Sequence, residues 1–207
     1  MKRFEERDVS HFYDLLQHNP ELGLTQLNVL DGDHLIGVGL FDNVEDFLAE
    51  CKRYNGLGQI HAGVNPRSLN LLDAYGGLKN RIRSLFVDVV TDEDIACVTG
   101  IVVRDVGQLT DAAQAYMRDI SVLDDGRLFF PMDNPLDFQD RSRRKLSKLL
   151  ASWFFGEADF QNVNLMRMVS VPGTAKQDSS FFRPRVRFRK FRPFILEGIS
   201  EAILEQE

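Results

Sequence analysis

Short segments with helical and with strand periodicity alternate along this chain, and that alternation limits its possible folds more than any other feature. Gly, Pro, Asn and Asp turns separate the segments. Helices are predicted over residues 8–17, 44–54, 92–98, 111–120, 141–155 and 195–205, and strands over 24–30, 34–41, 59–64, 101–103, 127–131, 164–171 and 181–194. Residues 85–90 fit either a strand or a helical turn. Interleaved elements of this kind predict an α/β or α+β fold with one central sheet flanked by helices.

The composition indicates a soluble globular chain. Its 207 residues are 43% apolar, and no apolar run approaches the roughly 20 residues that a membrane-spanning helix needs. The first residues carry charge without an apolar stretch after them, so we expect no secretory signal, a cytoplasmic location and no membrane partner. Neither Cys51 nor Cys97 has a histidine at ligand spacing, and we expect buried thiols rather than a disulfide or a zinc site.

Positive charge is concentrated in the last third of the chain. The net charge is −6, yet residues 141–194 hold 13 Lys and Arg against three acidic residues, so this segment is about +10 and the remainder about −16. A segregated basic region can bind a polyanion even when the whole chain is acidic, because phosphate contacts act over about one Debye length.

Arginine alternates with apolar residues over 181–194, the most unusual stretch of the sequence. On a strand, Arg183, Arg185, Arg187 and Arg189 would share one face. An amphipathic edge strand with its arginines in water is one explanation. The use of arginine rather than lysine favours a phosphate-bearing partner, since a guanidinium group binds two phosphate oxygens at once.

The predicted helix over 141–155 also begins with positive charge, from Arg141, Arg143, Arg144, Lys145 and Lys148. Cations at a helix N-terminus are unfavourable to the helix dipole. A solvated helix face and a site for an external anion both fit this pattern, and the dipole argument favours the anion.

Four short motifs follow one another in an order that resembles a known family. Residues 36–42 (IGVGLFD) and 63–67 (GVNPR) come first, then 162–176 (NVNLMRMVSVPGTAK) and 183–187 (RPRVR). Together they resemble motifs of the archaeo-eukaryotic primase (PrimPol-like) superfamily of phages and mobile elements. The resemblance extends over residues 25–190.

The resemblance implies an α+β fold with an RRM-like central sheet, mixed or antiparallel, of the primase–polymerase kind. The whole chain, 1–207, would be one domain. Within it, an N-terminal helical segment (1–24) and a βα unit (25–67) would precede an RRM-like, primase-like portion (68–194) and a C-terminal helix (195–207).

The family's activity is template-dependent nucleotidyl transfer with two divalent metal ions, Mg²⁺ or Mn²⁺, held by a D-x-D pair and a later Asp. In this sequence Arg104 and Val106 occupy the two acid positions around Asp105, while Asp159 fits the later position. One carboxylate cannot hold two metal ions, and an arginine repels them. This register therefore predicts a domain that does not polymerise.

An alternative register would retain activity. It uses Asp88 together with Asp92 or Asp94, although a solvated acidic loop and helix start explains these three residues without catalysis and is the favoured interpretation. Arg127 stands where the family has a histidine that contacts the nucleotide. His61, beside the NPR turn, is the one histidine placed to contribute, and a plain strand residue also fits it.

The sequence thus predicts a nucleic-acid-binding, primase–polymerase-like domain in DNA replication of a phage or mobile element, inactive or accessory in catalysis. An active DNA primase or polymerase and a non-enzymatic protein-interaction module are the alternatives. Expected partners are single-stranded or primer–template DNA, or RNA, with a helicase or another replication protein. The expected nucleic-acid or nucleotide contacts are Asn65, Arg67, Arg127, Arg167, Thr174, Lys176, Arg183, Arg185, Arg187 and Arg189. The candidate catalytic acids are Asp88, Asp105 and Asp159, and Asp159 is also the candidate metal ligand.

Overall fold

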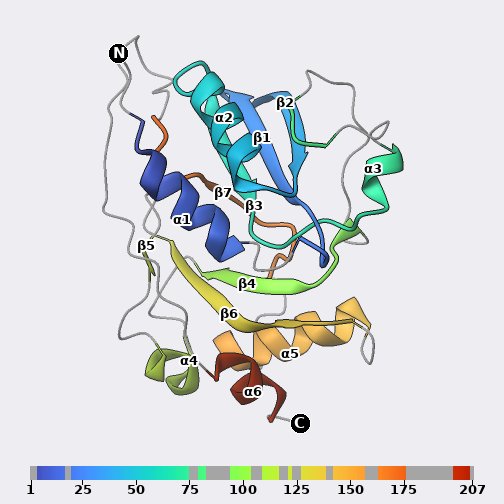
Figure 1. Ribbon diagram of the computed structural model, residues 1–207. Coiled ribbons are helices and arrows are strands. Elements are labelled where there is room, and N and C mark those ends of the chain that lie inside the picture. Colours follow the sequence, from blue (N-terminus) through green and yellow to red (C-terminus); the bar gives the residue numbers. More distant parts are fainter. Residues whose placement is uncertain are drawn as a thin grey trace.

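The described part of the chain folds as an α+β structure with two antiparallel sheets (Figure 1). This computed structural model describes residues 4–16, 20–74, 79–82, 94–103, 109–116, 121–122, 127–138, 142–156, 163–175 and 198–205. The helices are α1 (Glu6–Leu16), α2 (Val44–Tyr54), α3 (Leu71–Ala74), α4 (Asp111–Ala115), α5 (Arg143–Phe155) and α6 (Ile199–Leu204). The strands are β1 (Thr25–Asp31), β2 (His34–Phe41), β3 (Gln59–Gly63), β4 (Val98–Val103), β5 (Ser121–Val122), β6 (Leu128–Leu136) and β7 (Met168–Ser170).

The first sheet has the strand order β2-β1-β3-β7. Its strands alternate, so that one face is apolar: Leu27 and Val29 of β1 lie beside Ile60 and Ala62 of β3 in the first core. Helices α1 and α2 cover this face (Figure 1), and their buried side chains complete the core. The opposite face of β1, β3 and β7 carries polar residues.

The second sheet has the order β4-β6-β5 and is buried on both faces. Val102 and Phe129 pack into the first core, whereas their neighbours Ile101, Val103 and Phe130 pack into a second core with α5 and α6. This explains why β4 is apolar or small at every position rather than at alternate positions. Figure 1 shows α4, α5 and α6 on the side of this sheet that faces away from α1.

Helix α6 is held to β6 by one carboxylate. Asp133 accepts hydrogen bonds from the Gly198 amide (2.8 Å), the Ser200 amide (3.1 Å) and the Ser200 hydroxyl (2.8 Å). Burial would raise the pKa of Asp133, but these hydrogen bonds from Ser200 and Gly198 outweigh it and the pKa is lowered. Gly198 is the N-terminal capping residue of α6 and has no side chain that could accept a hydrogen bond. The ionised Asp133 carboxylate accepts these hydrogen bonds in its place.

Several sequence predictions are confirmed and others are wrong. The α+β class and the bounds of α2 agree with the structure, and Asn43 caps α2 by accepting a hydrogen bond from the Asp46 amide at 2.8 Å. The helix expected over 92–98 is wrong for its described part, because Ile95 pairs with Arg67 in an isolated bridge and β4 begins at Val98.

The prediction of one central sheet is also corrected, because the described strands form two. The strand expected over 164–171 shortens to β7, which pairs with β3 far back in the sequence instead of with β4 or β6. Such a pairing joins residues about a hundred positions apart, and local periodicity carries no information about it. No helix among the described residues is long and apolar enough to cross a membrane.

Candidate nucleic-acid interface

Asn65 lies inside the protein, where it connects the two sheets. Its side-chain oxygen accepts hydrogen bonds from the Thr99 amide (2.8 Å) and the Gly100 amide (3.1 Å), and its nitrogen donates to the Leu165 carbonyl (3.0 Å). Only 1% of Asn65 is exposed. These three bonds satisfy backbone groups of β4 and of the segment before β7, so Asn65 is a structural residue.

Arg67 is also buried, with an exposed fraction of 0%. Its backbone exchanges hydrogen bonds with Leu24, each 2.8 Å long. Its Nε donates to the Gln26 side-chain oxygen at 2.6 Å, and a terminal nitrogen approaches the Met168 sulfur at 3.7 Å. A Cβ at Gly63 would come within 2.9 Å of this guanidinium group, which would then have to shift.

The expectation that Asn65 and Arg67 contact nucleic acid is therefore corrected, because neither side chain reaches the surface. Both belong to the GVNPR segment that the family resemblance singled out. In the folded chain that segment follows β3, Arg67 pairs with Leu24 and Ile95 in isolated bridges, and both polar side chains turn inward.

The polar face of the first sheet carries an aligned set of side chains, Asn28, His61 and Ser170, which we call the polar row. Asn28 of β1 is the cross-strand partner of His61, and His61 of β3 is the partner of Ser170 of β7. All three are half-buried. The His61 Nε2 and Ser170 Oγ atoms lie 3.3 Å apart, and Gln26 donates to the Asn28 side-chain oxygen at 2.9 Å.

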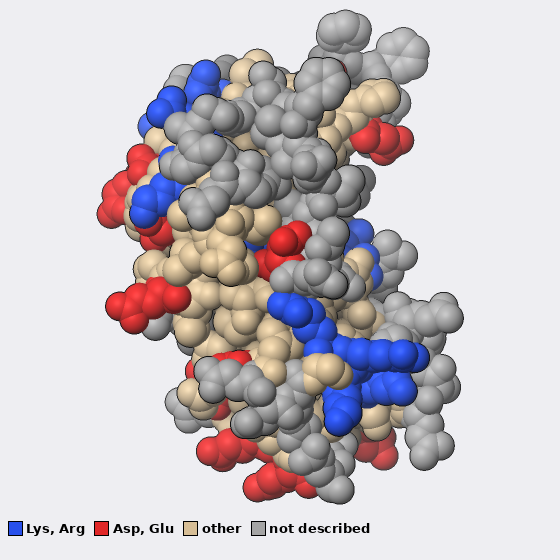
Figure 2. Space-filling view, turned by 90° about the vertical axis from the view of Figure 1, so that its right-hand side faces the viewer, with Lys and Arg blue, Asp and Glu red and all other residues tan. Residues whose placement is uncertain are grey.

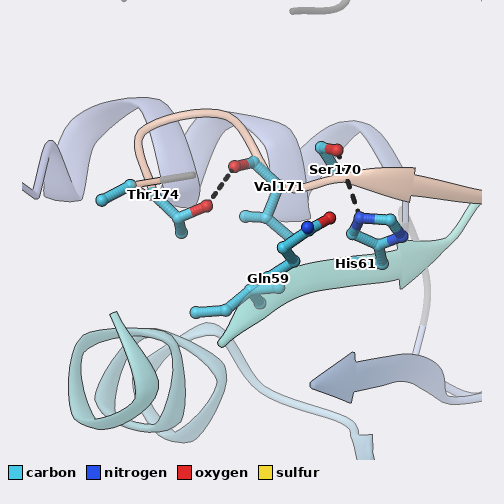
Figure 3. Close-up of a pocket in the computed structure, with 7 residues that line it drawn as sticks. Gln59, His61, Ser170, Val171 and Thr174 are labelled. Atoms are coloured by element: carbon cyan, nitrogen blue, oxygen red, sulfur yellow. Dashed lines mark hydrogen bonds between the residues drawn. The ribbon is translucent and has the colours of Figure 1, made fainter. Parts of the chain in front are cut away.

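A shallow pocket lies at the β7 end of the polar row (Figure 3). In Figure 3, the His61 ring and the Ser170 hydroxyl point toward each other from β3 and β7, with Gln59 beside them on β3. The pocket is lined by Gln59, Ile60, His61, Ser170, Val171, Thr174 and Ala175.

The PGT motif forms the turn that closes this pocket. Val171 to Thr174 has the arrangement of a type II turn: Pro172 is the second residue, Gly173 has φ +81°, and the Thr174 amide donates back to the Val171 carbonyl at 3.4 Å. The Thr174 hydroxyl donates to the same carbonyl at 2.7 Å. Thr174, expected to contact nucleic acid, thus uses its hydroxyl within its own turn.

Two contacts fasten the turn to the first core. The Glu5 amide donates to the Gly173 carbonyl at 2.9 Å, and the Ala175 amide donates to the Asn55 side chain at 2.7 Å. A Cβ at Gly173 would come within 2.5 Å of the Glu5 carbonyl oxygen. The structure thus accounts for the motif through backbone geometry and close packing.

The start of α5 presents exposed positive charge. Ser142 caps the helix by accepting a hydrogen bond from the Lys145 amide at 3.2 Å, and the first turn contains no acidic residue. Arg144, Lys145 and Lys148 are exposed, and we call them the basic face of α5. Figure 2 views the molecule from the side that lies on the right in Figure 1. Lys and Arg side chains gather on the lower part of this face, where α5 begins.

A chain of contacts connects the start of α5 to the polar row. Arg143 lies over the Phe138 ring and donates to the Ile95 carbonyl at 3.3 Å. Ile95 pairs with Arg67, which bonds to Gln26, and Gln26 bonds to Asn28. Arg143, which precedes the basic face, is thus linked to the polar row through three buried residues.

The remaining predicted residues are not brought together among the described parts of the chain. Arg127 is half-buried just before β6, and Arg167 is half-buried just before β7, with its carbonyl accepting from the Val64 amide at 2.9 Å. The others lie outside the described residues: Lys176, Arg183, Arg185, Arg187, Arg189, Asp88, Asp105 and Asp159. Within the described ranges, no group of three or more His, Cys, Asp or Glu side chains could hold a metal ion.

Asn28 and Ser170 did not emerge as site residues from the sequence. The alternation of Gln26 and Asn28 with Leu27 and Val29 indicates a polar strand face, but not the neighbours of that face. Comparison of the chain with protein-family models, with curated proteins and with solved structures found no match.

Proposed function

We propose that this chain is a nucleic-acid-binding, primase–polymerase-like domain that acts in DNA replication of a phage or mobile element, and that it is inactive or accessory in catalysis. The observation that carries the proposal is the basic face of α5. Three exposed cations stand within two turns of one helix whose other side is packed into the second core. A packed helix holds these charges at fixed spacing, as a phosphate backbone requires.

The arrangement is unfavourable for the isolated protein. Arg144 and Lys148 are four residues apart and Lys145 and Lys148 three apart, so like charges are neighbours on the helix surface. Arg144 and Lys145, which lie in the first turn, also oppose the helix dipole. A bound polyanion would offset both the repulsion between these cations and their unfavourable interaction with the helix dipole. Binding of a polyanion would therefore account for cations at these positions.

Salt dependence of binding to single-stranded DNA tests this proposal. Each phosphate contact contributes about −0.7 to the slope of log affinity against log salt, so the three cations predict about a 20-fold weakening from about 50 to about 200 mM salt. Fluorescence anisotropy of a labelled oligonucleotide measures it. An affinity that does not change with salt contradicts the proposal.

A pair of matched variants locates the contact. The double variant Arg144→Gln with Lys145→Gln should remove about two phosphate contacts. The weakening of binding between about 50 and about 200 mM salt should then be about sevenfold smaller than for the wild-type protein. Lys52→Gln with Arg53→Gln removes two exposed cations from the last turn of α2 and should leave binding unchanged. Equal losses in both variants would mean that net charge alone determines binding. Heparin competing as well as DNA, without preference for either, would indicate an acidic protein partner instead.

Primer extension with Mg²⁺ or Mn²⁺ tests the catalytic part of the proposal. We expect no nucleotide incorporation, because the register with Arg104 lacks a carboxylate pair for two metal ions. Incorporation that Asp88→Ala abolishes and Asp105→Ala spares would establish the alternative register, and an active enzyme.

A further inference from the structure

We infer that the polar row, Asn28–His61–Ser170, contacts the bases of a single-stranded nucleic acid whose phosphates the basic face of α5 holds. This inference rests on the proposed function and adds a second, uncharged part to the binding surface. Ser170 lies within the 162–176 motif, whereas Asn28 and His61 lie outside the four motifs.

The first argument is the asymmetry of the sheet. One face of β1, β3 and β7 is apolar and covered by α1 and α2, as a two-layer fold requires. On the other face, amide, imidazole and hydroxyl groups are adjacent in register across three strands, and all are half-buried. These groups can donate to and accept from base edges, and the His61 ring can also stack on a base.

The second argument is that buried residues orient the row from beneath. Arg67 holds Gln26, and Gln26 in turn donates to the oxygen of Asn28, which leaves the Asn28 amide nitrogen directed by the same network. Burying a guanidinium group is expensive in free energy unless its partners compensate. A buried network that ends on a half-exposed amide fixes that amide in one orientation, as a recognition site needs.

The third argument is that the start of α5 and the polar row belong to one connected part of the structure. Arg143, which precedes the basic face, donates to the Ile95 carbonyl, and Ile95 is linked to Asn28 through Arg67 and Gln26. In this proposal, a strand whose phosphates lie on the basic face extends to the polar row. Since duplex bases are stacked and paired, a flat sheet face can reach them only in a single strand.

The experiment separates base contacts from phosphate contacts. Binding is measured for three ligands of about 15 units: a thymidine strand, an abasic strand with the same phosphates, and a duplex. We expect the wild-type protein to prefer the thymidine strand to the abasic strand by about tenfold, and to the duplex as well. The variant His61→Ala should lose most of the preference over the abasic strand and keep the salt slope.

Matched variants complete the design. His34→Ala removes an exposed histidine from the β1–β2 hairpin and should leave the preference unchanged. Asn28→Ala should reduce the preference in the same way as His61→Ala. Arg144→Gln with Lys145→Gln should weaken thymidine and abasic strands equally, because it removes phosphate contacts only.

Each outcome decides between the two proposals. Equal affinity for thymidine and abasic strands would overturn this inference and leave the proposed function standing, whereas binding to neither would overturn the proposed function. If His61→Ala weakened both strands equally, or left the preference intact, the polar row would not be the base-contacting surface. Thermal unfolding of each variant separates these results from misfolding.

Discussion

Replacing Lys145 by Glu should make the protein more stable and, under the proposed function, weaken binding to DNA. Lys145 is the third residue of α5 after the cap Ser142, and its amide already donates to the Ser142 hydroxyl at 3.2 Å. Glutamate at this position completes a capping box, in which its side chain accepts from the amide of the capping residue. The same substitution removes one cation of the basic face.

Besides the capping box, two electrostatic effects of Lys145→Glu favour folding. Reversing the charge in the first turn removes an unfavourable interaction with the helix dipole and adds a favourable one, each about 0.3–1 kcal/mol before screening. The pair with Lys148 changes from repulsion to attraction, at about 0.2–0.5 kcal/mol for each. Because the site is exposed and salt screens it, we expect a gain of about 1 kcal/mol, or about 2–4 °C in Tm for a chain of this size.

Thermal unfolding and fluorescence anisotropy measure the two effects on the same samples. Lys145→Gln is the intermediate variant: it can complete the capping box and removes the positive charge without adding a negative one. Its stability and its affinity should both lie between those of wild type and Lys145→Glu. A variant that is less stable, or that binds DNA as tightly as wild type, would refute the claim that Lys145 serves an external anion at the expense of the helix.

Three further substitutions test the fold that positions the site. Asn65→Ala leaves three buried backbone groups unsatisfied and should lower the free energy of unfolding by about 3–5 kcal/mol in urea titrations, whereas half-exposed Asn28→Ala should cost under about 1 kcal/mol. Gly173→Ala combines a left-handed backbone with a clash and should cost about 3 kcal/mol, while Gly32→Ala, where nothing lies near the added Cβ, should cost about 1 kcal/mol. Asp133→Asn should cost about 1–2 kcal/mol at neutral pH. Since the folded-state pKa of Asp133 is lowered, its stabilisation is complete above about pH 4 and is lost as pH falls through that lower pKa, so the two stability curves should converge in acid.

The four basic residues at the start of α5 differ in their surroundings. The structure keeps like charges at a helix start where capping chemistry favours an acid, and it already uses Arg143 to fasten that start to Ile95 and Phe138. Arg143 thus packs against Phe138 and Ile95, whereas the residues of the basic face are exposed at the surface.

Elements whose causes are local can be predicted from the amino-acid sequence. Asn43 and the spacing of Phe47 and Cys51 predict α2 at its observed bounds, and the alternation in residues 24–30 predicts β1 within one residue. The cationic start of α5 was equally visible, because charge and helical periodicity are both read from a few neighbouring residues.

Contacts between residues far apart in the sequence follow from the tertiary structure and not from local patterns. Asn65 and Arg67 looked like surface residues of a motif, yet the packing of β4 and β7 around them encloses both. The polar row joins residues 28, 61 and 170, which become neighbours only because β7 returns to pair with β3. Strand order depends on which pairing buries the most apolar surface of the whole chain. A local sequence pattern does not contain this total buried area.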